Sequence, residues 1–312
     1  MSEIAIRAEG LGRAFGDMWA VRGLDLEIRR GEIFGLVGPD GAGKTTTMRL
    51  LTGILAASEG GATVAGFSID GDEEAIKSRI SYMSQRFGLY GDLTVEENLR
   101  FYADLYEVSR REREPLEERL LGFSNLTPFR KRLARNLSGG MKQKLGLACA
   151  LIHKPEILFL DEPTNGVDPV SRRDFWRILY AMLKEGVTIF VSTAYLDEAE
   201  RCTRVGLMHR GRLIQCDTPQ KLKAGIPGQL LEIETEHPRA AREALAAALG
   251  SNQVSLFGQL LHLYARDAAE AERSRSVLKE AGIRVVRERI ITPTLEDVFI
   301  HQVGEDDTVA RA

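Results

Sequence analysis

A glycine-rich octapeptide directly follows a short apolar run near the N-terminus of this 312-residue chain. Residues 38–45 read GPDGAGKT, which matches Gly-x-x-x-x-Gly-Lys-Thr, and residues 33–38, IFGLVG, are apolar throughout. The apolar run predicts a buried parallel strand, and residues 45–55 predict a helix. Strand, glycine loop and helix in this order indicate a phosphate-binding loop, because glycines let backbone N–H groups crowd around phosphate oxygens at a helix N-terminus.

The residue types of this loop predict how a nucleotide and its metal ion are held. Lys44 can reach the terminal phosphates of a nucleoside triphosphate, and the hydroxyl of Thr45 can hold Mg²⁺. The residues of the loop that we expect to contact the nucleotide are Gly38, Pro39, Asp40, Gly41, Ala42, Gly43, Lys44, Thr45 and Thr46.

Length and composition limit the class of protein. The chain has room for one large domain and a smaller one, and its net charge of −3 argues against a nucleic-acid partner held by a broad basic surface. No stretch approaches the roughly 20 apolar residues of a membrane span, and the N-terminus lacks the features of a signal peptide. Cys149, Cys202 and Cys216 lack metal-site spacing, which favours reduced thiols in the cytosol. A membrane process would therefore need a second chain.

The first 224 residues alternate strand and helix patterns. Residues 157–161 and 187–193 predict buried strands, and the amphipathic residues 171–186 between them predict a helix. This alternation indicates an α/β fold with a largely parallel sheet. From about residue 88 to residue 133 the pattern is helical, so we expect a helical subdomain inserted into the core.

A smaller domain is predicted after the Gly-Ile-Pro-Gly break at residues 225–228. Residues 229–300 read as strand, helix, hairpin, helix and strand, and this β-α-β-β-α-β order is typical of a ferredoxin-like α+β domain. The polar residues 303–312 predict a disordered tail.

Four further motifs follow the glycine loop in order. Gln85 lies in SYMSQRFGLY, residues 137–141 read LSGGM, residues 157–163 read ILFLDEP, and residues 165–169 read NGVDP. With the loop, these motifs make roughly residues 3–224 resemble the ABC ATPases. The resemblance implies a P-loop NTPase cassette with a RecA-like core, a helical subdomain, and ATP and Mg²⁺ as ligands.

The resemblance also implies a role for single residues. Phe15 would stack on adenine, Gln85 would contact Mg²⁺ and the attacking water, and Asp161 would orient the water shell of the metal. Glu162 would be the general base that activates this water. Asp168 would reach the site of an opposite subunit.

The Ser-Gly-Gly turn implies that two cassettes work together. In the family, the hydroxyl of Ser138 and the amides of Gly139 and Gly140 contact the γ-phosphate held by the loop of a partner cassette. The family has Gln after the two glycines and this chain has Met141. We expect the change to be tolerated, because serine and backbone make the phosphate contacts.

One departure from the family pattern concerns catalysis. Related ATPases carry a histidine after the Ser-Thr pair of VSTAYLDEAE, and this chain has Ala194. Alanine offers neither a hydrogen bond nor a charge, so we expect the site to bind ATP and turn it over poorly. We hypothesise an asymmetric pair with a cassette that has the histidine; a slow homodimer that relies on Glu162 is the alternative. By sequence position, none of the five histidines can substitute: His153, His209, His237, His262 and His301.

The motif details resemble the drug-exporter branch that works with ABC-2-type permeases, in particular the N-terminal cassette of its tandem ATPases. This implies ATP-driven efflux of drugs or other small hydrophobic molecules. The chain would lie on the inner face of the cell membrane, with residues 88–133 docked onto a separate permease. Two alternatives remain open: a soluble ABC ATPase without a membrane partner, and a regulatory subunit that uses ATP as a switch.

Overall fold

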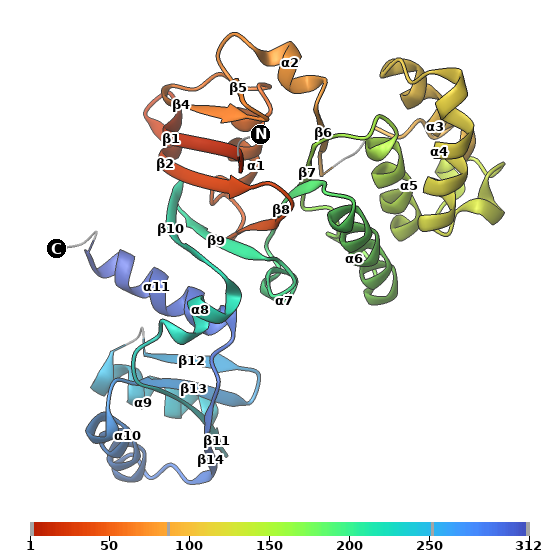
Figure 1. Ribbon diagram of the computed structural model, residues 1–312. Helices are drawn as coiled ribbons and strands as arrows, with labels where there is room; N and C mark the ends of the chain where they lie inside the picture. The colour runs from red at the N-terminus through yellow and green to blue at the C-terminus, as the bar shows by residue number, and fades with distance from the viewer. Residues whose placement is uncertain (1–2, 86–87, 251–252, 310–312) are drawn as a thin grey trace. The chain divides into compact units, whose positions relative to one another are not determined.

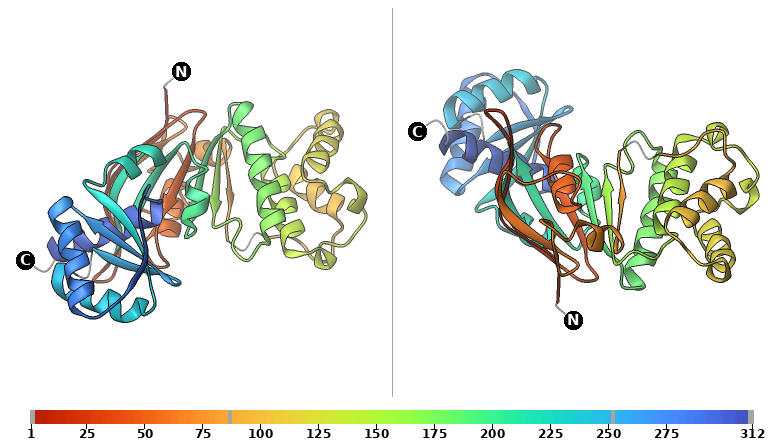
Figure 2. Two further views of the ribbon diagram at one scale, coloured as in Figure 1. Left: turned by 90° about the horizontal axis from the view of Figure 1, so that it is seen from below. Right: turned by 90° about the horizontal axis from the view of Figure 1, so that it is seen from above.

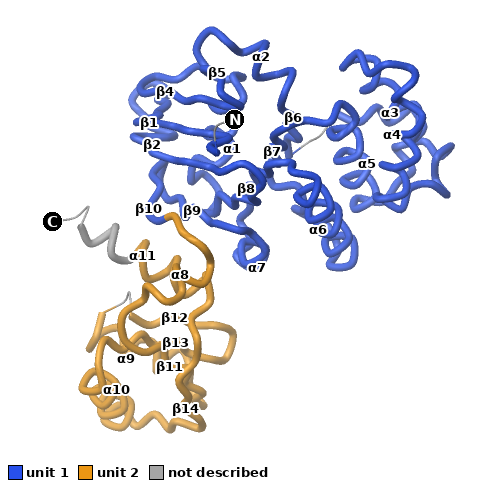
Figure 3. Tube along the Cα trace, in the orientation of Figure 1, with its two compact units in different colours: residues 1–215 blue, residues 216–312 orange. Residues whose placement is uncertain are grey.

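The computed structural model describes residues 3–85, 88–250 and 253–309 and divides the chain into two compact units (Figure 3). The first unit comprises residues 1–215 and the second residues 216–312. Each unit has its own sheet structure and its own buried core.

The larger sheet of the first unit has six strands in the order β10-β9-β3-β8-β7-β6 (Figure 1). From β9 to β6, neighbouring strands pair in parallel. All residues of β3, β7 and β8 are buried, which explains why these segments are nearly continuous apolar runs. The strands are β3 (Ile33–Val37), β6 (Ile80–Met83), β7 (Ile157–Asp161), β8 (Thr188–Thr193), β9 (Arg204–His209) and β10 (Arg212–Asp217).

The second sheet of this unit is antiparallel, in the order β2-β1-β4-β5. The long strands β1 and β2 are joined by a tight turn in which Gly16 has a φ of +60°, a conformation that favours glycine. Phe15 and Met18 pair at this turn. The strands are β1 (Ile4–Phe15), β2 (Met18–Arg29), β4 (Glu59–Val64) and β5 (Phe67–Ser68).

The helix after the glycine loop, α1 (Lys44–Leu51), is shorter than the segment 45–55 that the sequence predicts. Thr52 caps its C-terminus, and Gly53 has a φ of +68°, which a continuing right-handed helix cannot accommodate. Three more helices complete the core: α2 (Glu73–Lys77), α6 (Pro169–Lys184) and α7 (Leu196–Ala199).

A group of helices lies on one side of the six-stranded sheet (Figure 2) and extends beyond residues 88–133, the segment that the sequence predicts as a helical subdomain. It contains α3 (Val95–Leu105), α4 (Arg110–Phe123), two 3-10 turns at 127–129 and 134–136, and α5 (Gly139–Leu151). A capping box of Thr94 and Glu97 fixes the start of α3. Helix α5 contacts α3 and α4 as well as β6 and α6, so it links the subdomain to the core.

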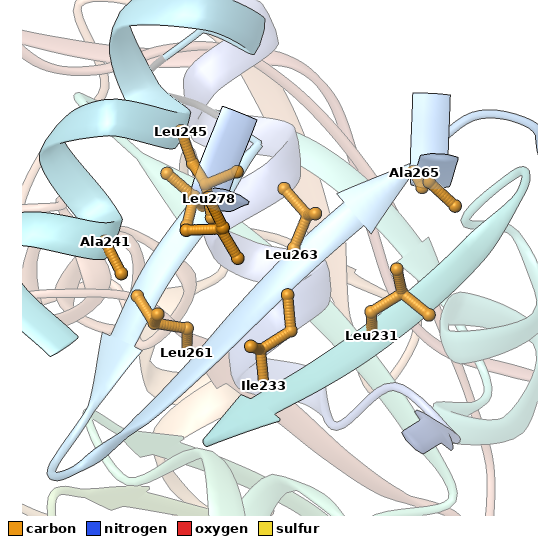
Figure 4. Packing of buried hydrophobic residues seen from close by; sticks show 10 residues of the cluster. Leu231, Ile233, Ala241, Leu245, Leu261, Leu263, Ala265 and Leu278 are labelled. Atoms are coloured by element: carbon orange, nitrogen blue, oxygen red, sulfur yellow. The ribbon is translucent and has the colours of Figure 1, made fainter. Parts of the chain in front are cut away.

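The second unit has the ferredoxin-like strand order that the sequence predicts, β12-β13-β11-β14, with every pair antiparallel. Helices α9 and α10 cover one face of this sheet, where Leu245 and Leu278 point toward Ile233 and Leu263 (Figure 4). The elements are β11 (Gln229–Thr235), α9 (Pro238–Leu249), β12 (Val254–Phe257), β13 (Leu260–Ala265), α10 (Ala268–Glu280) and β14 (Val285–Ile291).

The second unit differs from the predicted domain in its extent. It begins at residue 216 and includes α8 (Pro219–Ala224), which contacts α11 (Leu295–Val309) and buries Leu222. Residues 303–309, predicted to be disordered, belong to α11, because no proline follows to stop the helix that begins at Leu295. The rest of the predicted tail lies outside the described residues.

The burial of residues in the second unit predicts how alanine substitutions change the stability of this unit. Ile233 is fully buried, so Ile233→Ala should lower the free energy of unfolding of this unit by about 2–5 kcal/mol. Val286 in β14 is 56% exposed, and Val286→Ala should change it by less than about 0.5 kcal/mol. Denaturant-dependent hydrogen exchange of residues 229–291 measures both; equal effects of the two variants would contradict the assigned core.

Candidate nucleotide-binding site

A cleft of about 520 Å³ opens around the glycine loop. It joins the β1–β2 turn, the loop, the end of β6 and the segment after β7. The lining residues are Phe15, Met18, Ala20, Asp40, Gly41, Ala42, Gly43, Lys44, Thr45, Thr46, Gln85, Glu162 and Asn165. The cleft thus brings together the predicted adenine contact, most of the loop, and the predicted catalytic residues Lys44, Gln85 and Glu162.

Two glycines let the loop lie against neighbouring backbone. A Cβ atom on Gly38 would lie 2.1 Å from the carbonyl oxygen of Met208. Gly43 has a φ of +107°, and a Cβ atom there would lie 2.4 Å from the carbonyl oxygen of Ala20. Only glycine fits either position, and α1 begins directly after Gly43, so the loop presents a helix N-terminus to the cleft.

Lys44 is buried, with 4% of its side chain exposed, and its ammonium group contacts the loop itself. It donates hydrogen bonds to the carbonyl oxygens of Gly38 at 2.7 Å and Pro39 at 3.1 Å. It also forms an ion pair with Glu162 at 3.1 Å. The predicted phosphate ligand and the predicted general base therefore neutralise each other in this structure.

Asp161, at the end of β7, accepts hydrogen bonds from three neighbouring elements. The hydroxyl groups of Thr45 and Ser192 donate to Oδ1 at 3.0 and 2.7 Å, and that of Tyr82 donates to Oδ2 at 3.2 Å. Burial, and then the charge of Asp161, raise the pKa of Tyr82 to about 12. Thr45 and Asp161 offer the oxygen donors that Mg²⁺ prefers, so this pair, with Gln85 at the same cleft, fits the metal that the sequence predicts.

Glu162 follows in an unusual backbone conformation, with a φ of +48°. Its amide donates to the carbonyl and hydroxyl oxygens of Ser192 at 3.2 and 3.0 Å. Its Oε2 atom accepts from the amides of Gln85 and Asn165, both at 3.3 Å. The sequence reasoning missed Asn165, although its spacing of three residues from Glu162 in DEPTN could have indicated it.

The Ser-Gly-Gly turn and Asp168 lie outside this cleft. Ser138 caps α5 and Asp168 caps α6, each by accepting backbone hydrogen bonds, and these bonds lower the pKa of Asp168. A Cβ atom on Gly140 would lie 2.4 Å from the side chain of Ser171. The two caps are therefore close together, and Ser138, Gly139 and Asp168 are all exposed.

Ala194, where the family has histidine, is exposed just after β8. None of the described residues that line the cleft is a histidine. The cleft thus has no imidazole from another part of the described chain in place of the missing one.

Comparison with known proteins identifies the family. The family model described as ABC transporter matches residues 21–165. The daunorubicin resistance ATP-binding protein DrrA3 of Streptomyces coeruleorubidus is 33% identical over 315 residues, with the whole of both chains covered. The chain belongs to the ABC transporter ATP-binding proteins.

Two further proteins resemble the chain over different shares of its length. The probable multidrug ABC transporter ATP-binding protein YbhF of Escherichia coli (strain K12) is 43% identical over 309 residues. The alignment covers 97% of this chain and 53% of YbhF, so the chain spans about half the length of that relative. The solved structure of cbiO1 from Clostridium perfringens, part of the ABC transporter complex cbiONQ, is 27% identical with a TM-score of 0.67 and covers 72% of this chain and 92% of that one.

The packing around the Ser-Gly-Gly turn predicts that alanine substitutions at its two glycines change the stability of the protein differently. Gly140→Ala would push a methyl group into Ser171 and should lower the free energy of unfolding by about 1–3 kcal/mol. Gly139 has open space at the Cβ position, so Gly139→Ala should not destabilise the protein. Denaturant unfolding of both variants measures the difference; equal stability would contradict the close approach of α5 and α6.

Proposed function

We propose that this chain is the ATP-hydrolysing subunit of an ABC exporter that drives efflux of drugs or other small hydrophobic molecules. The observation that carries the proposal is the single cleft that joins Phe15, the glycine loop, Gln85 and Glu162. The names of DrrA3 and YbhF, which refer to daunorubicin resistance and multidrug transport, support the class of substrate. We place the subunit in the cytoplasm, on the inner face of the cell membrane.

Different residues of the cleft are suited to contact the adenine, the phosphates, the metal ion and the attacking water. Phe15 is 46% exposed where it lines the cleft, so its ring can stack on adenine. The loop amides and Lys44 would hold the phosphates. Thr45, Asp161 and Gln85 would hold Mg²⁺, which would neutralise charge on the phosphates. Glu162 accepts a proton from water as the water oxygen bonds to the γ-phosphorus and the bond to the oxygen of ADP breaks.

A second cassette is the first proposed partner. Ser138, Gly139 and Asp168 are exposed side by side and outside the chain's own cleft, where they can contact a nucleotide held by another subunit. Because Ala194 cannot contact the γ-phosphate, we favour a partner cassette that has the histidine. In such a pair, this chain binds ATP, hydrolyses it slowly and contributes its Ser-Gly-Gly turn to the partner's faster site.

A separate ABC-2-type permease is the second proposed partner. Among the described residues, no helix is both long and apolar enough to span a membrane. A groove of about 330 Å³ runs from Gln85 to the helical subdomain, and its lining includes Leu89, Arg135 and Lys142. A permease segment seated there would touch the same Gln85 that faces Glu162, so permease movements can reach the ATP site.

Ala194 also supports a second candidate function, a regulatory subunit that uses ATP as a switch. Such a subunit would bind ATP and hydrolyse almost none. Purified chain, alone and mixed with cassettes that retain the histidine, separates the two functions when ATP binding and turnover are both measured. Turnover on mixing, with co-purification of a permease, supports the exporter; binding without turnover in any mixture supports the switch.

Restoring the missing side chain gives the sharpest mutational prediction. Ala194→His should raise ATP turnover of the purified chain by about 10-fold or more, because the imidazole adds a contact to the γ-phosphate in the transition state. Glu162→Gln in the same background should abolish the gain and leave ATP binding intact. Unchanged turnover in Ala194→His would argue against a role for this position.

A further inference from the structure

We infer that Tyr195 and Asn165 position Glu162 for catalysis in this chain. The inference rests on the proposed function, because it concerns the same ATP site. Tyr195, the residue after Ala194, contacts Asn165, and Asn165 contacts Glu162. The segment after β8 would thus hold the proposed general base through Asn165.

Three donors contact the carboxylate of Glu162, and they differ in the roles proposed for them when ATP is bound. Lys44 contacts Oε1 at 3.1 Å, while Gln85 and Asn165 both donate to Oε2 at 3.3 Å. Lys44 is needed by the phosphates once ATP is bound, and Gln85 is assigned to the metal. Asn165 is the one of the three that has no other role assigned to it when ATP is bound.

Asn165 can hold a carboxylate only in one orientation of its amide. An ionised carboxylate accepts hydrogen bonds and cannot donate, so the NH₂ group of Asn165 has to face Glu162. The hydroxyl of Tyr195 donates to Oδ1 of Asn165 at 3.3 Å, on the other side of the amide. This hydrogen bond anchors the amide beside Glu162. A flipped amide would keep a bond to Tyr195, whose hydroxyl can also accept, but it would lose the bond to Glu162, so the carboxylate sets the orientation and the hydroxyl holds the side chain in place.

Tyr195 is itself fixed in place. Its amide donates to the hydroxyl of Thr193 at 2.9 Å, and the guanidinium of Arg172 lies 4.7 Å from the centroid of its ring. Arg172 is held in turn by the buried carboxylate of Glu198 at 3.2 Å. With its backbone amide bonded and Arg172 stacked on its ring, Tyr195 keeps its hydroxyl at Asn165 at a reduced cost in side-chain entropy.

The same contacts tie the end of β8 to the segment that holds the base. Glu198 accepts from Thr164, beside Asn165, at 2.6 Å and from Thr193, beside Ala194, at 3.3 Å. Residue 194 contributes only a methyl group, and residue 195 reaches Glu162 through one intermediate side chain. Tyr195 and Asn165 are therefore positioning residues, and neither is assigned a contact with the phosphate.

Single-turnover cleavage of ATP by excess purified chain tests the inference. Tyr195→Phe keeps the ring and loses the hydroxyl, and it should slow cleavage about 3- to 10-fold with ATP affinity unchanged. Asn165→Ala should slow cleavage at least as much, and the double variant should be no slower than Asn165→Ala. Tyr180→Phe is the matched control: Tyr180 is also 37% exposed, but its hydroxyl donates to the carbonyl of Arg201.

The pH–rate profile of Asn165→Asp gives a second test, because a loss of folding stability alone would not shift this profile. A second carboxylate beside Glu162 makes protonation of the base more favourable, so the acidic limb of the pH–rate profile should move to higher pH.

The outcomes separate failure of the inference from failure of the proposed function. Cleavage by Tyr195→Phe at the wild-type rate, additive effects of the two substitutions, or an unmoved pH profile would overturn the inference. Wild-type chain that binds ATP but cleaves none would also overturn it and leave the ATP-binding subunit intact. A chain that binds no ATP would overturn both.

Discussion

The hydrogen bonds to one buried carboxylate set the geometry of the ATP site. Asp161, 2% exposed at the end of β7, accepts from Thr45 at the start of α1, Ser192 in β8 and Tyr82 in β6. A buried carboxylate is costly unless it is hydrogen-bonded, so the start of α1 and the ends of β6, β7 and β8 have to meet where these donors reach it. These protein groups alone thereby fix the glycine loop and the ends of the sheet strands relative to each other.

Glu162, the next residue, brings a second carboxylate to the cleft. Glu162 keeps a φ of +48°, which costs about 1–3 kcal/mol outside glycine, and its amide is held by the same Ser192 that bonds Asp161. The backbone of Glu162, the proposed base, is therefore fixed by the sheet. Among the described residues, Lys44, Gln85 and Asn165 contact its carboxylate and set where its oxygens point.

Local patterns predicted the glycine loop, the buried strands and the ferredoxin-like order, because apolar periodicity and glycine spacing are written into contiguous residues. The end of α1 was missed, since the φ of Gly53 depends on the turn that follows. The sequence places the start of the second unit too late, because a lone apolar residue such as Leu222 could belong to the core of either unit. The contact of α8 with α11 places it in the second. Asn165 and Tyr195 carry no periodic signal, and only the fold brings their side chains together.

The ion pair of Lys44 with Glu162 connects ATP binding to catalysis in the proposed function. The ammonium group neutralises the carboxylate at 3.1 Å, where 4% and 12% of the two side chains are exposed. The triphosphate carries more negative charge than one carboxylate, so it draws Lys44 away and leaves the base with neutral donors only. Release of the base then requires bound ATP, and the neutral amides of Gln85 and Asn165 have to keep its orientation. Ala194 adds no further support, which makes the hydroxyl of Tyr195 behind Asn165 the part of the β8 end on which the base depends.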